Sequence, residues 1–136
     1  MKNPVCFLVD DDDDDREIFN LALENADSSY NCITAHNGPE ALKILHEDSS
    51  FKPRFIFIDL NMPYMSGKEF LAEIKRDERL CDIPAIIYTT SSYNKDVKEA
   101  QDLGATHFLV KPSSINILTS LLSNILHKNN LSYFLE

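Results

Sequence analysis

Four short apolar runs limit this chain to a small set of folds. They are rich in β-branched and aromatic residues and do not alternate with polar ones, which is typical of parallel strands buried under helices on both faces. A fifth run is more polar and suits an edge strand. In chain order, the predicted strands cover Val5–Val9, Asn31–Ala35, Phe55–Ile58, Ala85–Tyr88 and Phe108–Val110.

Segments with helical spacing separate these runs. One face of each of the first three helices is marked by residues three or four positions apart. These are Ile18, Leu21, Ala22 and Asn25 in the first helix, Ala41, Leu42, Ile44 and Leu45 in the second, and Phe70, Leu71 and Ile74 in the third. A strand followed by a helix, repeated five times, predicts an α/β fold with right-handed crossovers and a doubly wound sheet.

Polar residues mark the starts of the later helices. Two of them stand three residues before a glutamate, as in a capping box. Gly104 is expected to end the fourth helix, because glycine readily adopts the left-handed turn. The expected caps of the second to fifth helices are Asn37, Ser66, Ser92 or Asn94, and Ser113 or Ser114.

Length and composition predict one domain at residues 1–128, a short apolar tail at residues 129–136, and no output domain. No apolar stretch is long enough for a membrane, and the first residues lack a secretory signal, so we expect a cytoplasmic protein. Three widely spaced cysteines fit that reducing compartment. A formal net charge of −9 argues against DNA binding, since a phosphate backbone needs a partner of opposite charge.

Polar residues follow four of the predicted strands. Asp10 and Asp11 follow the first and begin a run of six aspartates, and Asp59, Thr89 and Lys111 end the third, fourth and fifth. Such strand ends meet at one edge of a parallel sheet, where these folds bind ligands. Carboxylates bind Mg²⁺, while a hydroxyl and an ammonium group stabilise phosphoryl oxygens. The sequence therefore predicts a magnesium and phosphoryl site.

These residues resemble the receiver domain of two-component response regulators. The motifs, in order, are Val9-Asp10-Asp11, Asp59-Leu60-Asn61-Met62-Pro63 with Ser66-Gly67, Thr89, and Phe108-Leu109-Val110-Lys111-Pro112. The resemblance covers the chain from about Val5 to the end of the fifth helix. It implies a flavodoxin-like fold, with five helices and a five-stranded parallel sheet of order 2-1-3-4-5. The chain length and Thr89-Thr90-Ser91 are also similar to single-domain regulators that partner bacterial phytochromes.

The resemblance implies a stand-alone regulator that receives a phosphoryl group from a sensor histidine kinase or a phosphotransfer protein. Asp59 would be the phosphoacceptor, and Lys111 would pair with it and then with the phosphoryl oxygens. Asp10, Asp11, Asp59 and the Asn61 backbone carbonyl would hold Mg²⁺, which Mn²⁺ or Ca²⁺ could replace. The protein would not be an enzyme in the usual sense, because it would catalyse only its own phosphorylation and dephosphorylation.

The resemblance also implies a conformational switch. Thr89 would move its hydroxyl onto the phosphoryl group, and Phe108 would rotate inward behind it, so that the domain controls a protein partner or a phosphorelay. A cis peptide bond between Lys111 and Pro112 is expected to aim the ammonium group into the site. Asp12 to Asp15 exceed the family pattern, and we assign them to a helix cap, the helix dipole or solvent.

Two other functions stay open. A phosphatase of the haloacid dehalogenase type would use Asp10 as nucleophile and Asp12 as acid and base, but Asp59 would then be idle. A phosphorylation-independent interaction module of receiver fold typically lacks the acidic pair or the acceptor, which this chain keeps. The aspartate run could also be a solvated face, although its position after a buried strand argues otherwise.

The last predicted helix is apolar on more than one stripe. Its apolar residues are Ile115, Ile117, Leu118, Leu121, Leu122, Ile125 and Leu126, and the tail that follows contains Leu131, Tyr133, Phe134 and Leu135. One stripe should pack on the sheet and leave apolar surface for a partner. We therefore expect a homodimer through this helix and the tail, unless the tail folds back on its own domain.

Overall fold

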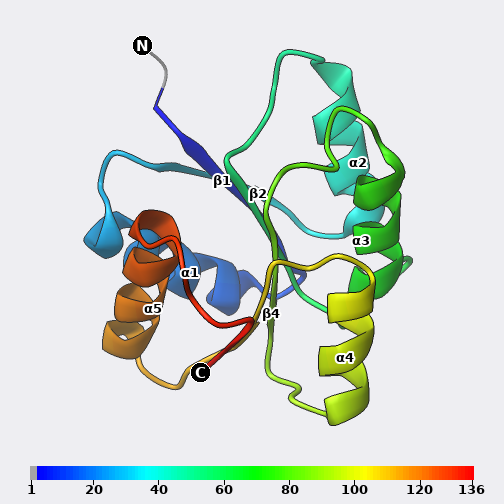
Figure 1. Ribbon diagram of the computed structural model, residues 1–136. Coiled ribbons are helices and arrows are strands. Elements are labelled where there is room, and N and C mark those ends of the chain that lie inside the picture. Colours follow the sequence, from blue (N-terminus) through cyan, green and yellow to red (C-terminus); the bar gives the residue numbers. More distant parts are fainter. Residues whose placement is uncertain (1–2) are drawn as a thin grey trace.

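The computed structural model describes residues 3–136, which form one parallel sheet with helices on both faces (Figure 1). Residues 1 and 2, with which the predicted domain begins, lie outside the described residues. The strands are β1 (Val5–Val9), β2 (Asn31–Ala35), β3 (Phe55–Ile58), β4 (Ala85–Thr89), β5 (His107–Val110) and β6 (Phe134–Leu135). The helices are α1 (Asp13–Ala26), α2 (Gly38–Glu47), α3 (Gly67–Arg76), α4 (Asn94–Asp102) and α5 (Ile115–His127).

The strand order is β2-β1-β3-β4-β5-β6, and each neighbouring pair is parallel. The predicted order 2-1-3-4-5 and the flavodoxin-like arrangement are therefore confirmed, and a short sixth strand extends the predicted five. Figure 1 shows α1 and α5 on one face of the sheet and α2, α3 and α4 on the other. Two separate apolar clusters fill the spaces between the sheet and these helix layers.

The strand register brings the carboxyl ends of β1, β3 and β4 to one level. Val9 pairs with Ile58, and Ile58 pairs with Ile87, while Thr89 pairs with Val110 at the end of β5. Because the chain leaves all these strands at the same edge, the residues that follow them converge there. This edge is the lower end of the molecule in Figure 1.

The helix caps agree with most expectations. Asn37, Ser66 and Ser114 cap α2, α3 and α5 through their side chains, and only Ser66 completes a full capping box. Gly104 follows α4 with a φ of 103°, as expected. The expected cap of α4 is wrong, because Tyr93 occupies the N-cap position and makes no side-chain capping bond.

The face predicted for α1 is also wrong in part. The helix buries Phe19, Ala22 and Leu23, whereas Ile18 and Leu21 are 37% and 47% exposed. The helix carries two apolar stripes, and the one that contains the large Phe19 ring packs against Phe57 and Tyr88 of the sheet. Periodicity alone does not choose between two such stripes.

The expected cis bond before Pro112 is wrong as well. Every peptide bond in the described chain is trans, including that between Lys111 and Pro112. The trans form has the lower energy even before proline, and Lys111 reaches the site without the cis bond.

The C-terminal tail folds back on the domain and adds β6 beside β5. The Phe108 amide donates to the Tyr133 carbonyl over 2.8 Å, and the Tyr133 hydroxyl donates to the Val97 carbonyl of α4 over 2.7 Å. The Phe108 and Phe134 rings stack with centroids 6.0 Å apart and an interplanar angle of 18°. The tail therefore covers the edge of the sheet that β5 would otherwise expose. No helix within residues 3–136 has the length and apolar character that crossing a membrane requires.

Candidate metal and phosphoryl site

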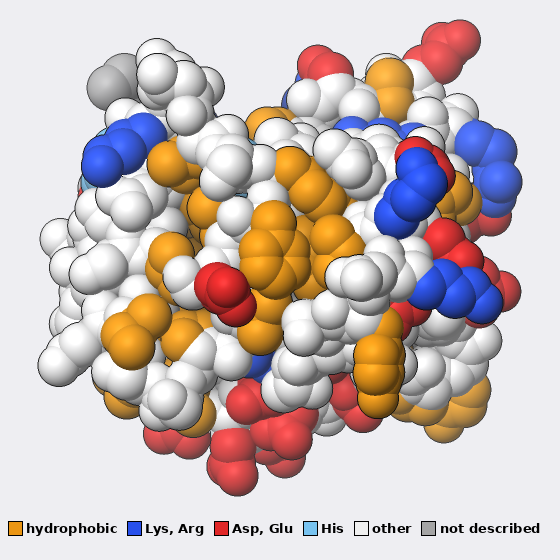
Figure 2. Space-filling model, turned by 60° about the horizontal axis from the view of Figure 1, so that its bottom comes forward, with side chains coloured by type: hydrophobic (Ala, Val, Ile, Leu, Met, Phe, Trp, Pro, Cys, Tyr) orange, Lys and Arg blue, Asp and Glu red, His pale blue; other side chains and the backbone are white. Residues whose placement is uncertain are grey.

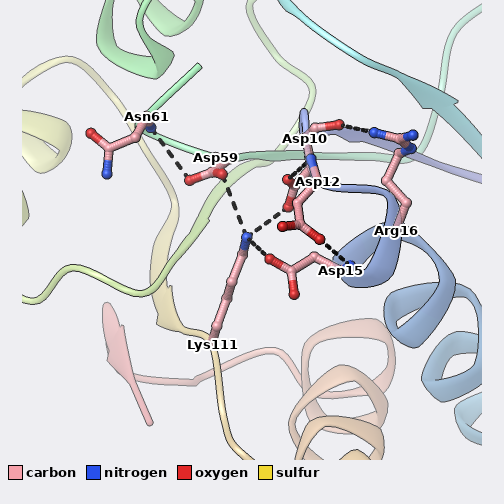
Figure 3. A network of polar contacts seen from close by, with 7 residues as sticks. All are labelled: Asp10, Asp12, Asp15, Arg16, Asp59, Asn61 and Lys111. Carbon is pink, nitrogen blue, oxygen red and sulfur yellow. Dashed lines mark hydrogen bonds and ion pairs between the residues drawn. The ribbon is translucent and has the colours of Figure 1, made fainter. Parts of the chain in front are cut away.

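Charged side chains from three separate parts of the chain meet at the carboxyl edge of the sheet (Figure 3). Lys111, which directly follows β5, places its ammonium nitrogen 2.8 Å from Asp10 Oδ2, 2.7 Å from Asp15 Oδ2 and 3.4 Å from Asp59 Oδ2. The Lys111 side chain is only 8% exposed, and its nitrogen lies 5.1 Å from the centre of the Tyr88 ring. The predicted convergence of Asp10, Asp59 and Lys111 is thus observed.

Three of the carboxylates form a group that could hold a cation. Asp10, Asp11 and Asp59 each offer an oxygen within 4.8 Å of the others; Asp10 and Asp59 are buried, and Asp11 is exposed. Hard cations such as Mg²⁺ prefer oxygen ligands of this kind and keep several waters, so an exposed carboxylate beside two buried ones fits such an ion. Asn61 is linked to the group by its amide, which lies 3.4 Å from Asp59 Oδ1. The role of its carbonyl as a ligand stays a prediction.

Burial and charge shape the ionisation of this site. Burial raises the pKa of Asp10 to about 6, although hydrogen bonds from Lys111 and from the Asp12 amide work in the opposite direction. Burial lowers the pKa of Lys111, but its hydrogen bonds to Asp10 and Asp15 and the charge of Asp59 outweigh that and raise it above its ordinary value. Lys111 therefore remains an ammonium ion, and it is the main positive charge that offsets the buried carboxylates.

Thr89 lies beside the cluster with its hydroxyl unsatisfied. The residue is fully buried, and its Oγ1 atom has no hydrogen-bond partner. Its backbone carbonyl accepts a 2.7 Å hydrogen bond from the Lys111 amide, which ties the end of β4 to the end of β5. A buried hydroxyl without a partner is costly, so the Thr89 hydroxyl would gain from a hydrogen-bond acceptor placed within its reach.

Phe108 is completely buried, in contact with both the core and the tail. In this state it is already directed inward, and Phe134 covers it. A rotation of Phe108 from an exposed position is therefore not available here, and any movement of this ring would have to involve the tail.

The later aspartates of the run divide into different roles. Asp12 caps α1 by accepting a 2.9 Å hydrogen bond from the Asp15 amide, and Asp13 to Asp15 lie in the first helical turn. Asp15 is the residue that sequence reasoning missed, because its carboxylate belongs to the Lys111 cluster. Its position in the first turn of α1, six residues after the end of β1, was the available signal, but it does not specify a partner more than ninety residues away.

One surface cavity lies far from this cluster. It is lined by residues such as Val5, Lys52 and Ile83, at the amino ends of the strands. Lys52 there pairs with Asp82 on the surface. The cavity brings together none of the predicted site residues, so the chemistry concentrates at the opposite edge.

Comparison with known proteins gives a consistent result. The sequence profile described as response regulator receiver domain matches residues 6–123. The chain is 29% identical to the response regulator Rcp1 of Synechocystis sp. over 89% of this chain and 85% of Rcp1. It is 29% identical to the chemotaxis protein CheY of Pseudomonas aeruginosa over 90% of this chain and 96% of CheY.

Some relatives are longer than this chain. The matched region covers 54% of the phosphate regulon transcriptional regulatory protein PhoB of Pseudomonas aeruginosa, which is 31% identical over 94% of this chain. It covers 45% of the probable transcriptional regulator ycf29 of Pyropia yezoensis. The chain thus spans about half the length of these two relatives.

Solved structures show the same fold. The phosphorylated cyanobacterial phytochrome response regulator RcpA superposes with a TM-score of 0.84 at 29% identity, covering 95% of this chain and 98% of RcpA. The Mn²⁺-bound form of Rcp1 gives a TM-score of 0.81 at 28% identity, covering 95% of this chain and 99% of that structure.

Proposed function

Because this chain belongs to the response regulator receiver domain family, we propose that Asp59 accepts a phosphoryl group from a sensor histidine kinase or a phosphotransfer protein. The observation that carries this assignment is the position of Asp59. Its carboxylate is buried, contacts the Lys111 ammonium group, and shares a cation-sized cluster with Asp10 and Asp11.

The reaction needs the residues of this cluster in distinct roles. An Asp59 oxygen attacks the phosphorus atom, an O–P bond forms, and the bond from phosphorus to the donor breaks with its electron pair leaving on the donor. Lys111 donates to the phosphoryl oxygens and offsets their charge as they approach a carboxylate. Hydrolysis of the aspartyl phosphate returns the free carboxylate, so the chain would catalyse only its own phosphorylation and dephosphorylation.

Asp10, Asp11, Asp59 and the Asn61 carbonyl would hold Mg²⁺, for which Mn²⁺ or Ca²⁺ could substitute. The relative Rcp1 has been solved in a Mn²⁺-bound form. When bound, the metal ion supplies positive charge that reduces the repulsion between the carboxylate and the phosphoryl oxygens. The oxygen-only donor set supports a hard cation at this position.

Thr89 and Phe108 would transmit the phosphorylation state. The unpartnered Thr89 hydroxyl gains a hydrogen bond if it donates to a phosphoryl oxygen, which gives the phosphorylated form a stabilisation that the resting form lacks. Movement at the end of β4 would reach Phe108 through the paired strand β5. Since the Phe108 amide is hydrogen-bonded to the Tyr133 carbonyl and the Phe108 ring is stacked on Phe134, the tail would respond to that movement.

The output would be a protein contact or a phosphorelay in the cytoplasm, without DNA or membrane binding. The phytochrome response regulators among the solved relatives support a photoreceptor kinase as one class of donor. We retain residues 1–128 as the receiver domain and residues 129–136 as its tail. A homodimer through α5 would use Ile115 and Ile117, which are 39% and 49% exposed, because the apolar residues of the tail already pack against the two apolar clusters of its own domain.

The assignment is tested by incubating the protein with acetyl phosphate and Mg²⁺ and measuring its intact mass. We expect a gain of one phosphoryl group that disappears in EDTA and in the variant Asp59→Asn. Equal labelling of that variant would contradict the role of Asp59. The haloacid dehalogenase alternative is not favoured, because Asp10 is completely buried and Asp12 is engaged as a helix cap.

A further inference from the structure

Lys111 has three N–H donors, and three carboxylates surround it. The contacts to Asp15 and Asp10 are 2.7 and 2.8 Å, within the usual range for a charge-assisted hydrogen bond, and that to Asp59 is 3.4 Å. In the resting state the ammonium group is therefore held chiefly by Asp10 and Asp15. Figure 3 shows Asp15 approaching Lys111 from α1, on a different side from Asp59.

The three carboxylates differ in what else they can bind. Asp10 and Asp59 belong with Asp11 to the group of carboxylates that could hold a cation, and Asp15 does not. A divalent cation and the Lys111 ammonium group therefore compete for Asp10 and Asp59. If Asp10 and Asp59 were the only partners of Lys111, metal binding would leave a largely buried ammonium ion that shares both of its carboxylates with the metal ion. A buried charge in that position is unfavourable.

We propose that Asp15 is a positioning residue that keeps Lys111 in place while the metal ion takes Asp10 and Asp59. The inference rests on the proposed function of the site and adds a residue to it. Asp15 acts through Lys111 and does not itself contact the metal ion. Its own position is fixed, because its amide donates to the Asp12 cap and its side chain is only 32% exposed.

The helix supports this role for a carboxylate. Asp15 lies in the first turn of α1, where the partial positive charge of the helix terminus stabilises a negative side chain. The site therefore keeps a carboxylate beside Lys111 that lies outside the group able to hold the metal ion. The neighbouring Asp14 lies in the same turn and is also an aspartate, but it is exposed and is not among the three carboxylates that pair with Lys111.

Titration calorimetry of Mg²⁺ into the metal-free full chain tests the proposal without phosphorylation. We expect Asp15→Asn to weaken Mg²⁺ binding on the order of tenfold, as for other residues coupled by direct contact. Asp14→Asn removes the same charge from the same helical turn and should weaken binding by less than about twofold, the effect expected of an exposed and screened charge. Asp15→Glu should restore most of the affinity.

A double variant separates an effect through Lys111 from a general charge effect. In a Lys111→Ala background, Asp15→Asn should change Mg²⁺ affinity no more than Asp14→Asn does. Equal weakening by Asp15→Asn and Asp14→Asn in the wild-type background would overturn the proposal, as would tighter binding in Asp15→Asn. The proposed function is tested separately. If Asp59 is not labelled but Asp15→Asn still binds Mg²⁺ much more weakly than the wild type and Asp14→Asn, phosphorylation is refuted and the role of Asp15 stands.

Discussion

Removal of the Lys111 ammonium group should destabilise the metal-free protein and strengthen its response to Mg²⁺. In Lys111→Ala, Asp10 remains completely buried, and within residues 3–136 its carboxylate keeps a hydrogen bond from the Asp12 backbone amide alone. Removing one partner of a buried ion pair typically costs about 3–5 kcal/mol of unfolding free energy. Asp10 can relieve part of this by taking up a proton, so we expect a loss of about 3 kcal/mol at pH 7.5.

Urea unfolding in EDTA, followed by circular dichroism, measures this loss. The matched control is Lys68→Ala, since Lys68 also bridges two carboxylates, but these are Asp96 and Glu99 outside the metal cluster, and its side chain is 25% exposed. Partly exposed ion pairs contribute little, so the control should lose about 1 kcal/mol or less. A loss below about 1 kcal/mol in Lys111→Ala itself would refute the view that Lys111 is the essential counter-charge.

The metal response gives a second and independent outcome. A ligand present at one hundred times its dissociation constant stabilises a protein by about 2.7 kcal/mol. Because Lys111 no longer competes for Asp10 and Asp59, Lys111→Ala should gain more unfolding free energy from a given Mg²⁺ concentration than the wild type. A smaller or equal gain would show that the ammonium group and the metal ion do not compete.

Three further predictions concern the loop, the tail and pH. Gly67→Ala should abolish phosphoryl labelling, since a Cβ there would lie 2.3 Å from the Asp59 carbonyl oxygen, whereas Gly38→Ala, which meets only a flexible methionine side chain, should still be labelled. Phe134→Ala should lower the unfolding free energy by about 2 kcal/mol, less than for a fully buried ring, and should speed hydrogen exchange in β5; unchanged exchange would contradict the packing of the tail. The raised Asp10 pKa means that the folded protein holds this proton more tightly than the unfolded chain, so in EDTA this group adds about 1 kcal/mol of stability as the pH falls from 7 to 5. Urea unfolding of Asp10→Asn at both pH values should lack that rise.

The strands and most of the site could be predicted because their signals are local. A buried parallel strand needs a short β-branched run, and the polar residue that ends it must then lie at the ligand edge. This logic placed Asp10, Asp59, Thr89 and Lys111 together from four separate segments, and the structure brings them together. Because all four residues follow strands of one parallel sheet, the position of one edge of that sheet determines the positions of all of them.

The failures concern choices that depend on tertiary contacts. The apolar stripe with Ile18 and the one with Phe19 have the same period, and only packing against Phe57 and Tyr88 selects the second. The strand at Phe134 is two residues long and exists because β5 offers it an unpaired edge. The sequence predicts only a helix cap, the helix dipole or solvent for Asp15, because its partner Lys111 comes from the far end of the chain.

The exposed part of the aspartate run has a kinetic consequence. Residues 11–14 are exposed at the entrance to the site, and Figure 2 shows acidic side chains gathered on this side of the molecule. At physiological ionic strength their field extends about 8 Å, so it acts on a donor before contact. A small anionic phosphodonor is repelled and should react faster as salt is added, whereas a protein donor with a basic surface is attracted and should react more slowly. We therefore expect the acidic entrance to favour basic protein donors over small anionic phosphate donors, which the opposite salt dependence of the two reaction rates would test.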